Sequence, residues 1–96
     1  SLSTEEIYTY TETGAIDTIS TFDSFSEKTI QRVFRYTNDL LTEITTYGNN
    51  KEVTNRVIYK YDSIGNPIKV SEYNIANKFG TTVNELVFMS EVVYNY

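Results

Sequence analysis

Tyrosines and carboxylates are the side chains of this 96-residue chain that could do chemistry, since it has nine tyrosines, thirteen acidic residues, and no histidine or cysteine. Without histidine, a serine or threonine nucleophile lacks its usual base. Zinc sites built on histidine or cysteine are likewise excluded. Carboxylate pairs and tyrosine rings remain, and each would make a different kind of site.

Paired carboxylates could hydrolyse a glycosidic bond, which requires two such groups about 5–9.5 Å apart across a cleft. Most of the candidates lie beside threonine and lysine at strand positions that we expect to face solvent, so we interpret them as solvated: Glu6, Asp17, Glu43, Glu72 and Glu91. A calcium loop needs closely spaced oxygen ligands, and DSFSE at residues 23–27 matches that pattern poorly. We therefore predict that the chain is not an enzyme and holds no metal or other cofactor.

The tyrosines belong to a repeat. Residues 6–22, 32–47 and 56–73 each contain an aromatic-x-Tyr pair, then a turn, then apolar residues leading to a closing aromatic. The second tyrosines of these pairs, Tyr10, Tyr36 and Tyr61, recur at intervals of 26 and 25 residues, and VVYNY at residues 92–96 restarts the pattern. A repeat of this length indicates one supersecondary unit stacked on its neighbours.

Each unit has the pattern of a β-hairpin, because aromatic and β-branched residues alternate around a short turn and no stretch sustains a period of 3.6 residues. Gly14 and Gly65 stand where a type I turn needs a following residue with positive φ. The second unit lacks this glycine, so Asn38 and Asp39 must make a tighter turn. Asp62 is placed to hydrogen-bond the turn backbone.

The predicted fold is all-β. It is an antiparallel meander of about three repeated β-hairpins plus a C-terminal strand, arranged as a single twisted sheet, a small sandwich or an open barrel. The chain forms one domain, residues 1–96, with units at about 4–22, 30–47 and 54–74 and a partial unit at 85–96. Strands are expected at residues 4–11, 15–22, 30–37, 40–47, 54–62, 67–74 and 85–96. Residues 23–29 are expected to form a linker with room for a helical turn, and 74–85 the longest loop.

The two-residue period of a strand assigns the side chains to faces. Ile7, Val33, Ile58 and Val93 project on one face, and an aromatic ladder projects on the other. Cross-strand aromatic pairs each contribute roughly 0.2–1 kcal/mol, so we interpret the rings first as staples of the sheet. They also form a candidate ligand platform for sugar rings: Tyr8, Tyr10, Tyr36, Tyr59, Tyr61, Tyr94 and Tyr96.

The run LVFM at residues 86–89 is apolar on both faces of its expected strand. Such a strand is covered on two sides, either within the chain or by a second copy in a homodimer. We expect burial within the chain, because an exposed run of this kind promotes aggregation.

Charge and hydropathy exclude two classes of partner. The net charge of -5 repels phosphate backbones and no Lys/Arg cluster offsets it, so we expect no nucleic-acid partner. The longest apolar runs are far too short to cross a bilayer, so we expect no membrane insertion.

The third unit contains YKYDSIGN at residues 59–66, which resembles the signature of YD repeats in RHS-type repeat proteins of bacterial surfaces. The first unit has Thr11 and Ala15 in place of the aspartate and the asparagine, and the second unit lacks the glycine. Together the three units cover about half of the chain. The resemblance implies hairpins joined into a continuous sheet, an extracytoplasmic location in the periplasm or at the cell surface, and carbohydrate binding. Three units are too few to form the enclosing shell of large family members.

Two functions are compatible with these features. The first is a non-enzymatic repeat module of a surface or periplasmic protein that binds a glycan or a protein partner through a face or an edge of its sheet. The alternative is a purely structural module that self-associates through its apolar C-terminal strand.

Overall fold

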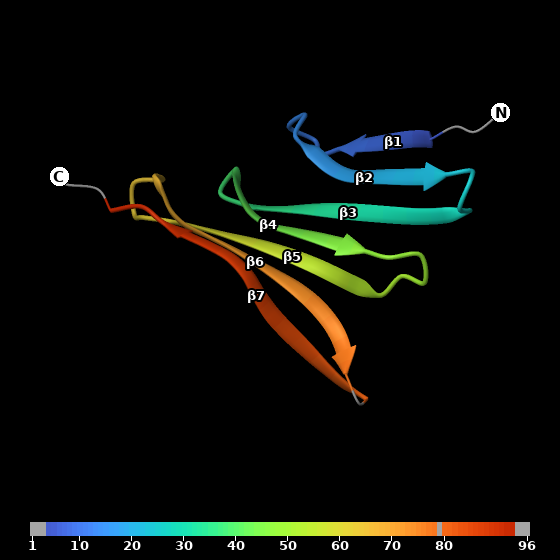
Figure 1. Ribbon diagram of the computed structural model, residues 1–96. Helices are drawn as coiled ribbons and strands as arrows, with labels where there is room; N and C mark the ends of the chain where they lie inside the picture. Colours follow the sequence, from blue (N-terminus) through green and yellow to red (C-terminus); the bar gives the residue numbers. More distant parts are fainter. Residues whose placement is uncertain (1–3, 79, 94–96) are drawn as a thin grey trace.

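Residues 4–78 and 80–93, which the computed structural model describes, form a single antiparallel sheet of seven strands (Figure 1). Each strand pairs with the next one in the sequence, so the sheet order is the chain order. The strands are β1 (Thr4–Tyr10), β2 (Ile16–Asp23), β3 (Lys28–Thr37), β4 (Leu40–Tyr47), β5 (Val53–Tyr61), β6 (Pro67–Lys78) and β7 (Thr81–Glu91). The predicted all-β meander is confirmed, and it is one open sheet rather than a sandwich or a barrel.

Turn chemistry sets the ends of the hairpins. Gly14 and Gly65 have φ angles of 89° and 90°, so both adopt the left-handed conformation that was predicted for them. In the third unit, Gly65 N–H donates to the Asp62 carbonyl at 3.1 Å, and Asp62 N–H donates to the Asn66 carbonyl at 2.9 Å. These bonds define a type I turn followed by a glycine bulge.

In the turns that contain Gly14 and Gly65, the side chain of the first turn residue accepts the same backbone hydrogen bond. Asp62 Oδ1 accepts from the Asn66 N–H at 2.9 Å, and Thr11 Oγ1 accepts from the Ala15 N–H at 3.2 Å. The predicted role of Asp62 is confirmed. Threonine thus replaces aspartate in the first unit without loss of the turn geometry.

The turns between β3 and β4 and between β4 and β5 use non-glycine residues with positive φ. Asn38 and Asp39 have φ angles of 51° and 64°, which makes the predicted tight two-residue turn. Lys51, between β4 and β5, has φ 64°, and its N–H donates to the Gly48 carbonyl at 2.9 Å. Lys51 therefore holds a position that glycine would occupy with less strain.

The linker after β2 is a short turn and not a helical one. The Phe25 N–H donates to Asp23 Oδ1 at 3.0 Å, and Lys28 already pairs with Asp23 in the sheet. Residues 24–27 form a turn and contain no helix. The described residues include no helix, and so none that is long and apolar enough to cross a membrane.

The expected long loop at residues 74–85 is wrong, because β6 continues to Lys78 and β7 begins at Thr81. Ile75 pairs with Asn84, and Ala76 pairs with Val83. Gly80, with φ 78°, lies in the tight connection between the strands. Polar residues are tolerated in these strands because a single-layer sheet has no core that their side chains would have to enter. The strands form because their backbones are hydrogen-bonded to each other.

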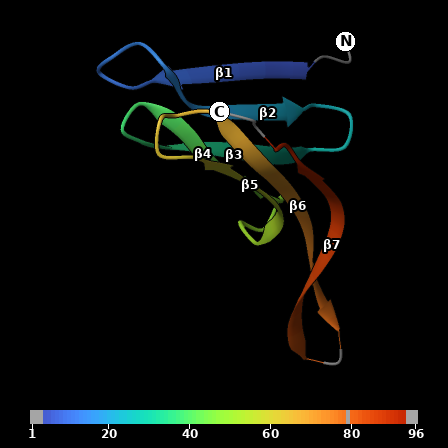
Figure 2. The ribbon, with the colours of Figure 1, turned by 90° about the vertical axis from the view of Figure 1, so that its left-hand side faces the viewer.

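A β-bulge follows the turn of each repeated hairpin. The extra residues are Asp17 in β2, Thr42 in β4 and Ile68 in β6, at the same position in each unit. Bulges increase the right-handed twist of a sheet. Figure 2 shows the result, since the strand direction turns steadily from β1 to β7.

Almost no side chain is fully enclosed, because the sheet has one layer. Ile19 is the buried apolar side chain of the described residues, at 7% exposure. Thr45 and Ser71 are the buried polar ones, at 1% and 5%. The expected burial of residues 86–89 within the chain is wrong: β7 is an edge strand, and the exposure of these four residues is 50–52%.

We predict opposite effects of valine at Gly65 and glycine at Lys51. Gly65→Val should lower the free energy of unfolding by about 1–2 kcal/mol, because a β-branched residue is strained at positive φ. Lys51→Gly should leave stability unchanged or raise it, because it removes the same strain. Thermal unfolding of both variants is the measurement; an unchanged melting temperature for Gly65→Val would contradict this account of the turn.

Candidate functional site

The tyrosines of the predicted platform share one face of the sheet, as far as they are described. Residues that are paired across neighbouring strands project on the same side of the sheet. The extra residues of the hairpin bulges lie on β2, β4 and β6, so side chains alternate without interruption around the tyrosines of β1, β3 and β5. We call this the tyrosine face; it carries Tyr8, Tyr10, Tyr36, Tyr59 and Tyr61. Ile7, Val33 and Ile58 lie on the opposite face, as predicted. Tyr94 and Tyr96 lie outside the described residues, and Val93 lies beyond the end of β7.

Two of these tyrosines join neighbouring hairpins. The Tyr36 hydroxyl donates to the Ile16 carbonyl at 2.7 Å, and the Tyr61 hydroxyl donates to the Leu41 carbonyl at 2.6 Å. In both cases the acceptor lies 20 residues earlier, at the start of the strand that follows the preceding turn. Burial, with a smaller effect of Tyr59, raises the pKa of Tyr61. Both hydroxyls hydrogen-bond the backbone of the preceding hairpin, which supports the interpretation that Tyr36 and Tyr61 stabilise the sheet.

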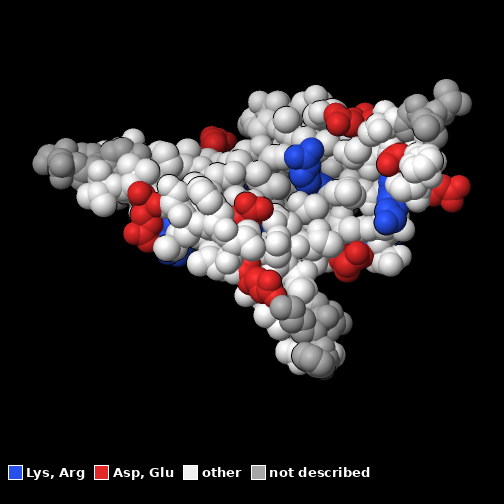
Figure 3. Space-filling view, in the orientation of Figure 1, with Lys and Arg blue, Asp and Glu red and all other residues white. Residues whose placement is uncertain are grey.

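The rest of the tyrosine face does not form a continuous platform. Tyr8 and Tyr10 lie on the edge strand β1 and are 42% and 61% exposed. The Tyr8 hydroxyl donates to Glu6 Oε2 at 2.7 Å, and this carboxylate raises the pKa of Tyr8. In the orientation of Figure 1, charged side chains are scattered over a surface that is mostly uncharged (Figure 3).

A hollow of about 360 Å³ opens between the turn that joins β1 to β2 and the turn that joins β3 to β4. Its wall contains one acidic side chain and no basic one: Thr11, Thr13, Ala15, Tyr36 and Asp39. With the Tyr36 hydroxyl already bonded, this hollow offers few groups that could orient a ligand.

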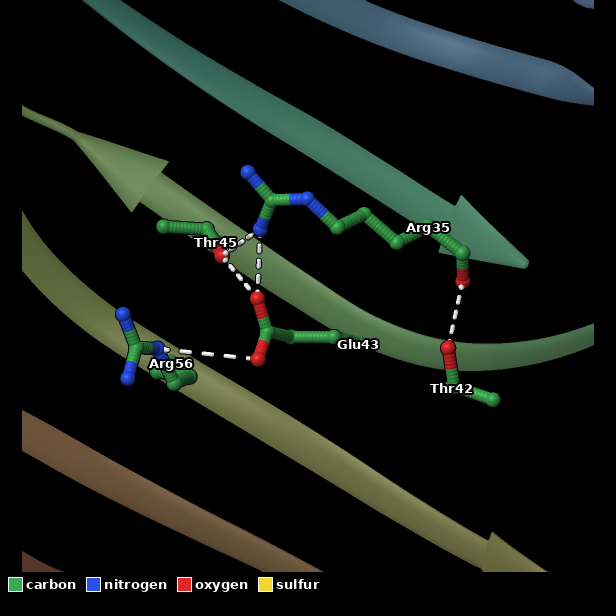
Figure 4. Close-up of polar contacts among 5 residues, drawn as sticks. All are labelled: Arg35, Thr42, Glu43, Thr45 and Arg56. Carbon is green, nitrogen blue, oxygen red and sulfur yellow. Dashed lines mark hydrogen bonds and ion pairs between the residues drawn. The ribbon is translucent and has the colours of Figure 1, made fainter. Parts of the chain in front are cut away.

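A network of charged side chains occupies the middle of the opposite face, which we call the arginine face (Figure 4). Glu43 on β4 lies between Arg35 on β3 and Arg56 on β5. Its Oε2 accepts hydrogen bonds from Arg35 and from the Thr45 hydroxyl, the latter at 2.8 Å. Its Oε1 lies 3.7 Å from Arg56 Nε. One carboxylate therefore serves two guanidinium groups.

The charge state of Glu43 follows from this geometry. Burial alone would raise the pKa of Glu43, but hydrogen bonds from Thr45 and Arg35 and the positive charges of Arg56 and Arg35 lower it below its ordinary value. Hydrogen bonding to Tyr47, and then to Glu43, raises the pKa of Arg35. Both shifts favour the charged forms of Glu43 and Arg35. With two arginines and one glutamate, the formal charge of the network is positive.

The guanidinium groups retain donors for a further partner. The side chains of Arg35 and Arg56 are 50% and 38% exposed. Arg56 Nε is buried and makes no hydrogen bond. Lys60 and Lys69 lie directly opposite each other on the same face, and Lys69 pairs with Glu91 at 3.7 Å. Like charges that face each other across a ladder are destabilising, so this arrangement favours an anion nearby.

Hollows with an aromatic wall flank the network on the arginine face. One, of about 280 Å³, is lined by Arg56, Ile58, Tyr73, Ile75 and Asn84. Another, of about 300 Å³, is lined by Ser20, Thr29, Gln31, Tyr47, Gly48, Asn49 and Lys51. The face thus combines cationic groups with a tyrosine on either side of them.

The predicted carboxylates are dispersed. Glu6 bonds Tyr8, Glu91 pairs with Lys69, and Glu72 accepts from Asn55 at 2.9 Å. The interpretation of Glu43 as a solvated side chain is wrong, because its side chain is only 24% exposed, its Oε2 accepts hydrogen bonds and its Oε1 forms an ion pair with Arg56. No group of three acidic side chains with metal-binding geometry occurs among residues 4–78 and 80–93.

Sequence reasoning overlooked the arginine face. The two-residue period that placed Phe34 and Tyr36 together also places Arg35 opposite to them, on the face of Ile58. The strand alternation alone therefore places Arg35 on this face, but the repeated tyrosines indicate only the other face. Neither family models, nor curated proteins, nor solved structures gave a match to this chain.

The tyrosine hydroxyls give a prediction on stability. Tyr36→Phe and Tyr61→Phe should each lower the free energy of unfolding by about 0.5–1.5 kcal/mol, because each removes a hydrogen bond to a partly buried carbonyl. Tyr59→Phe is the matched control, since its hydroxyl has no hydrogen bond within the described residues, and it should change little. Urea unfolding of the three variants tests this. Equal losses at positions 36 and 59 would show that the inter-hairpin bonds contribute nothing.

Glu43→Gln should destabilise the protein in a pH-dependent way. The folded-state pKa of Glu43 is lowered, so its contribution is complete above the unfolded-state pKa and is lost as the pH falls through the folded-state value. At pH 7 the loss should be about 1 kcal/mol, because the partners are half exposed. Thermal unfolding from pH 7 down to pH 3 should show the wild type and the variant converging. Glu12→Gln, in the exposed first turn, is the control, and a constant difference across the range would contradict the role of Glu43.

Proposed function

We propose that this chain is a non-enzymatic β-hairpin repeat module of a surface or periplasmic protein, and that it binds a glycan bearing carboxylate or sulfate groups through the arginine face. The observation that carries the proposal is the sharing of Glu43 by Arg35 and Arg56. This sharing leaves one positive charge and several guanidinium N–H donors at an accessible position. The surface or periplasmic setting rests on the resemblance of the third unit to YD repeats.

The chemistry of the face suits such a ligand. Guanidinium groups bind carboxylate and similar anions through paired hydrogen bonds with defined geometry. Tyrosine rings offer an apolar surface and a hydroxyl to the same molecule. Tyr73 on β6 lies directly opposite Arg56 on β5, and Tyr47 lies on β4, two residues beyond Thr45, which is the β4 partner of Arg56. The two tyrosines are therefore about 12 Å apart, on a diagonal across the strands, with Arg56 on the strand between them. An extended chain of sugars lying across the strands would meet an aromatic ring, a cation and a second ring in turn.

A titration with neutral, uronic-acid and sulfated oligosaccharides tests the proposal, followed by amide and tyrosine resonances. Acidic glycans should shift the signals of residues around Arg35, Arg56, Tyr47 and Tyr73, and the affinity should fall with added salt because exposed charges are screened. Arg56→Gln should weaken binding by about tenfold to a hundredfold, the equivalent of one charged hydrogen bond.

Arg32→Gln is the matched control, because Arg32 pairs with Ile19 and Thr46 on the tyrosine face. It removes the same charge from the protein but should leave the affinity unchanged. Equal losses for the two variants would mean that binding depends on net charge alone. Unchanged spectra across the whole panel would remove glycan binding as the function.

A further inference from the structure

The two edges of the sheet constrain how a second chain could extend it. A meander of seven antiparallel strands has an odd number of strands, so β1 and β7 run in the same direction. A copy added by simple translation would therefore place its β1 parallel to β7. Antiparallel pairing in a closed dimer requires a two-fold axis that joins β7 to β7 or β1 to β1.

The two edges differ in what they expose. β1 carries the adjacent carboxylates Glu5 and Glu6, and charged residues of this kind protect an edge against pairing. β7 carries Leu86, Val87, Phe88 and Met89, each about half exposed. Within the described residues, β7 pairs only with β6, so one side of its backbone remains open to hydrogen bonding.

The bulge in β7 decides which residues share a face. Tyr73 pairs with Leu86 and Glu72 pairs with Phe88, so Val87 is an extra residue. Met89 pairs with Ser71. Leu86 and Met89 therefore lie on the same face, although they are three positions apart; without the bulge they would lie on opposite faces.

We propose that two copies of this chain pair through β7 about a two-fold axis perpendicular to the sheet, with Leu86 of each copy opposite Met89 of the other. In this register Val87 faces Phe88, Glu85 faces Ser90, and Asn84 faces Glu91. Every apolar residue of the run meets an apolar partner on its own face, and no carboxylate meets another. The apolar run is thus complementary to itself, and the pairing brings no like charges together, which favours a second copy as the occupant of this edge.

The pairing also places the two arginine faces on the same side of a continuous fourteen-stranded sheet, because a perpendicular axis does not exchange the faces. Self-association is independent of the glycan proposal, since the Arg35, Glu43 and Arg56 network lies on β3, β4 and β5, away from the β7 edge. Either proposal can fail without affecting the other.

Light scattering over a concentration series measures the oligomeric state. The wild type should change from the 11.1 kDa monomer to a dimer. Val87→Lys should raise the dissociation constant by about tenfold or more, because it places a charge from each copy next to an apolar strand at the axis. Ile7→Lys, at a 61% exposed position on the opposite edge, should leave the dimer unchanged.

Cross-linking tests the register. The chain has no cysteine, so a mixture of Leu86→Cys and Met89→Cys proteins should form a disulfide-linked heterodimer on oxidation, because directly opposite Cβ atoms lie about 4.5–5.5 Å apart. Ile7→Cys mixed with Met89→Cys should not cross-link at a comparable rate. A monomer at millimolar concentration, a dimer insensitive to Val87→Lys, or equal cross-linking in both mixtures would overturn the proposal.

Discussion

The bond from a tyrosine hydroxyl to the backbone of the preceding hairpin is the interaction on which this architecture depends. A single-layer sheet has no second layer to fix the position of one hairpin against the next. Tyr36 and Tyr61 provide that restraint on one face, and the Arg35, Glu43 and Arg56 network provides it on the other. The repeat of about 25 residues is the spacing that brings each such tyrosine over the strand that it bonds.

Glu43 connects the structural and functional roles of the arginine face. Its carboxylate joins β3, β4 and β5, so removing it would affect stability as well as charge. Because two guanidinium groups share this one carboxylate, the same network that holds three strands together also leaves a positive charge in a protein of net charge -5. The stabilising ion pair and the proposed anion-binding surface are here one arrangement of side chains.

The turns and the strand alternation could be predicted from the sequence, because they depend on local chemistry. Gly14, Gly65 and Asp62 take the roles that their residue types require. The length of β6 and β7 could not be predicted in this way, since NIANK and TTVNE lack the β-branched and aromatic alternation of a half-buried strand. The exposure of residues 86–89 was missed for a related reason: apolarity on two faces was interpreted as burial, and whether a second layer exists is a property of the whole fold.

The candidate site was predictable only in part. Tyrosine spacing identified one face correctly, but it could not show that two hydroxyls on that face bond the backbone. The convergence of Arg35 and Arg56 on Glu43 needs the register of three strands, which depends on the bulge after each turn.

Among the described residues, each strand contacts only the strands that come directly before and after it in the chain. The sheet can therefore fold one hairpin at a time, because no pairing joins segments that are far apart in the sequence. Proteins with such local contacts fold faster than β proteins with distant strand pairs. The same locality means that the terminal hairpins open first. β3, β4 and β5, which carry the Arg35, Glu43 and Arg56 network, are each paired with a strand on both sides, so we expect the network to lie on a part of the sheet that opens less readily than its two edges.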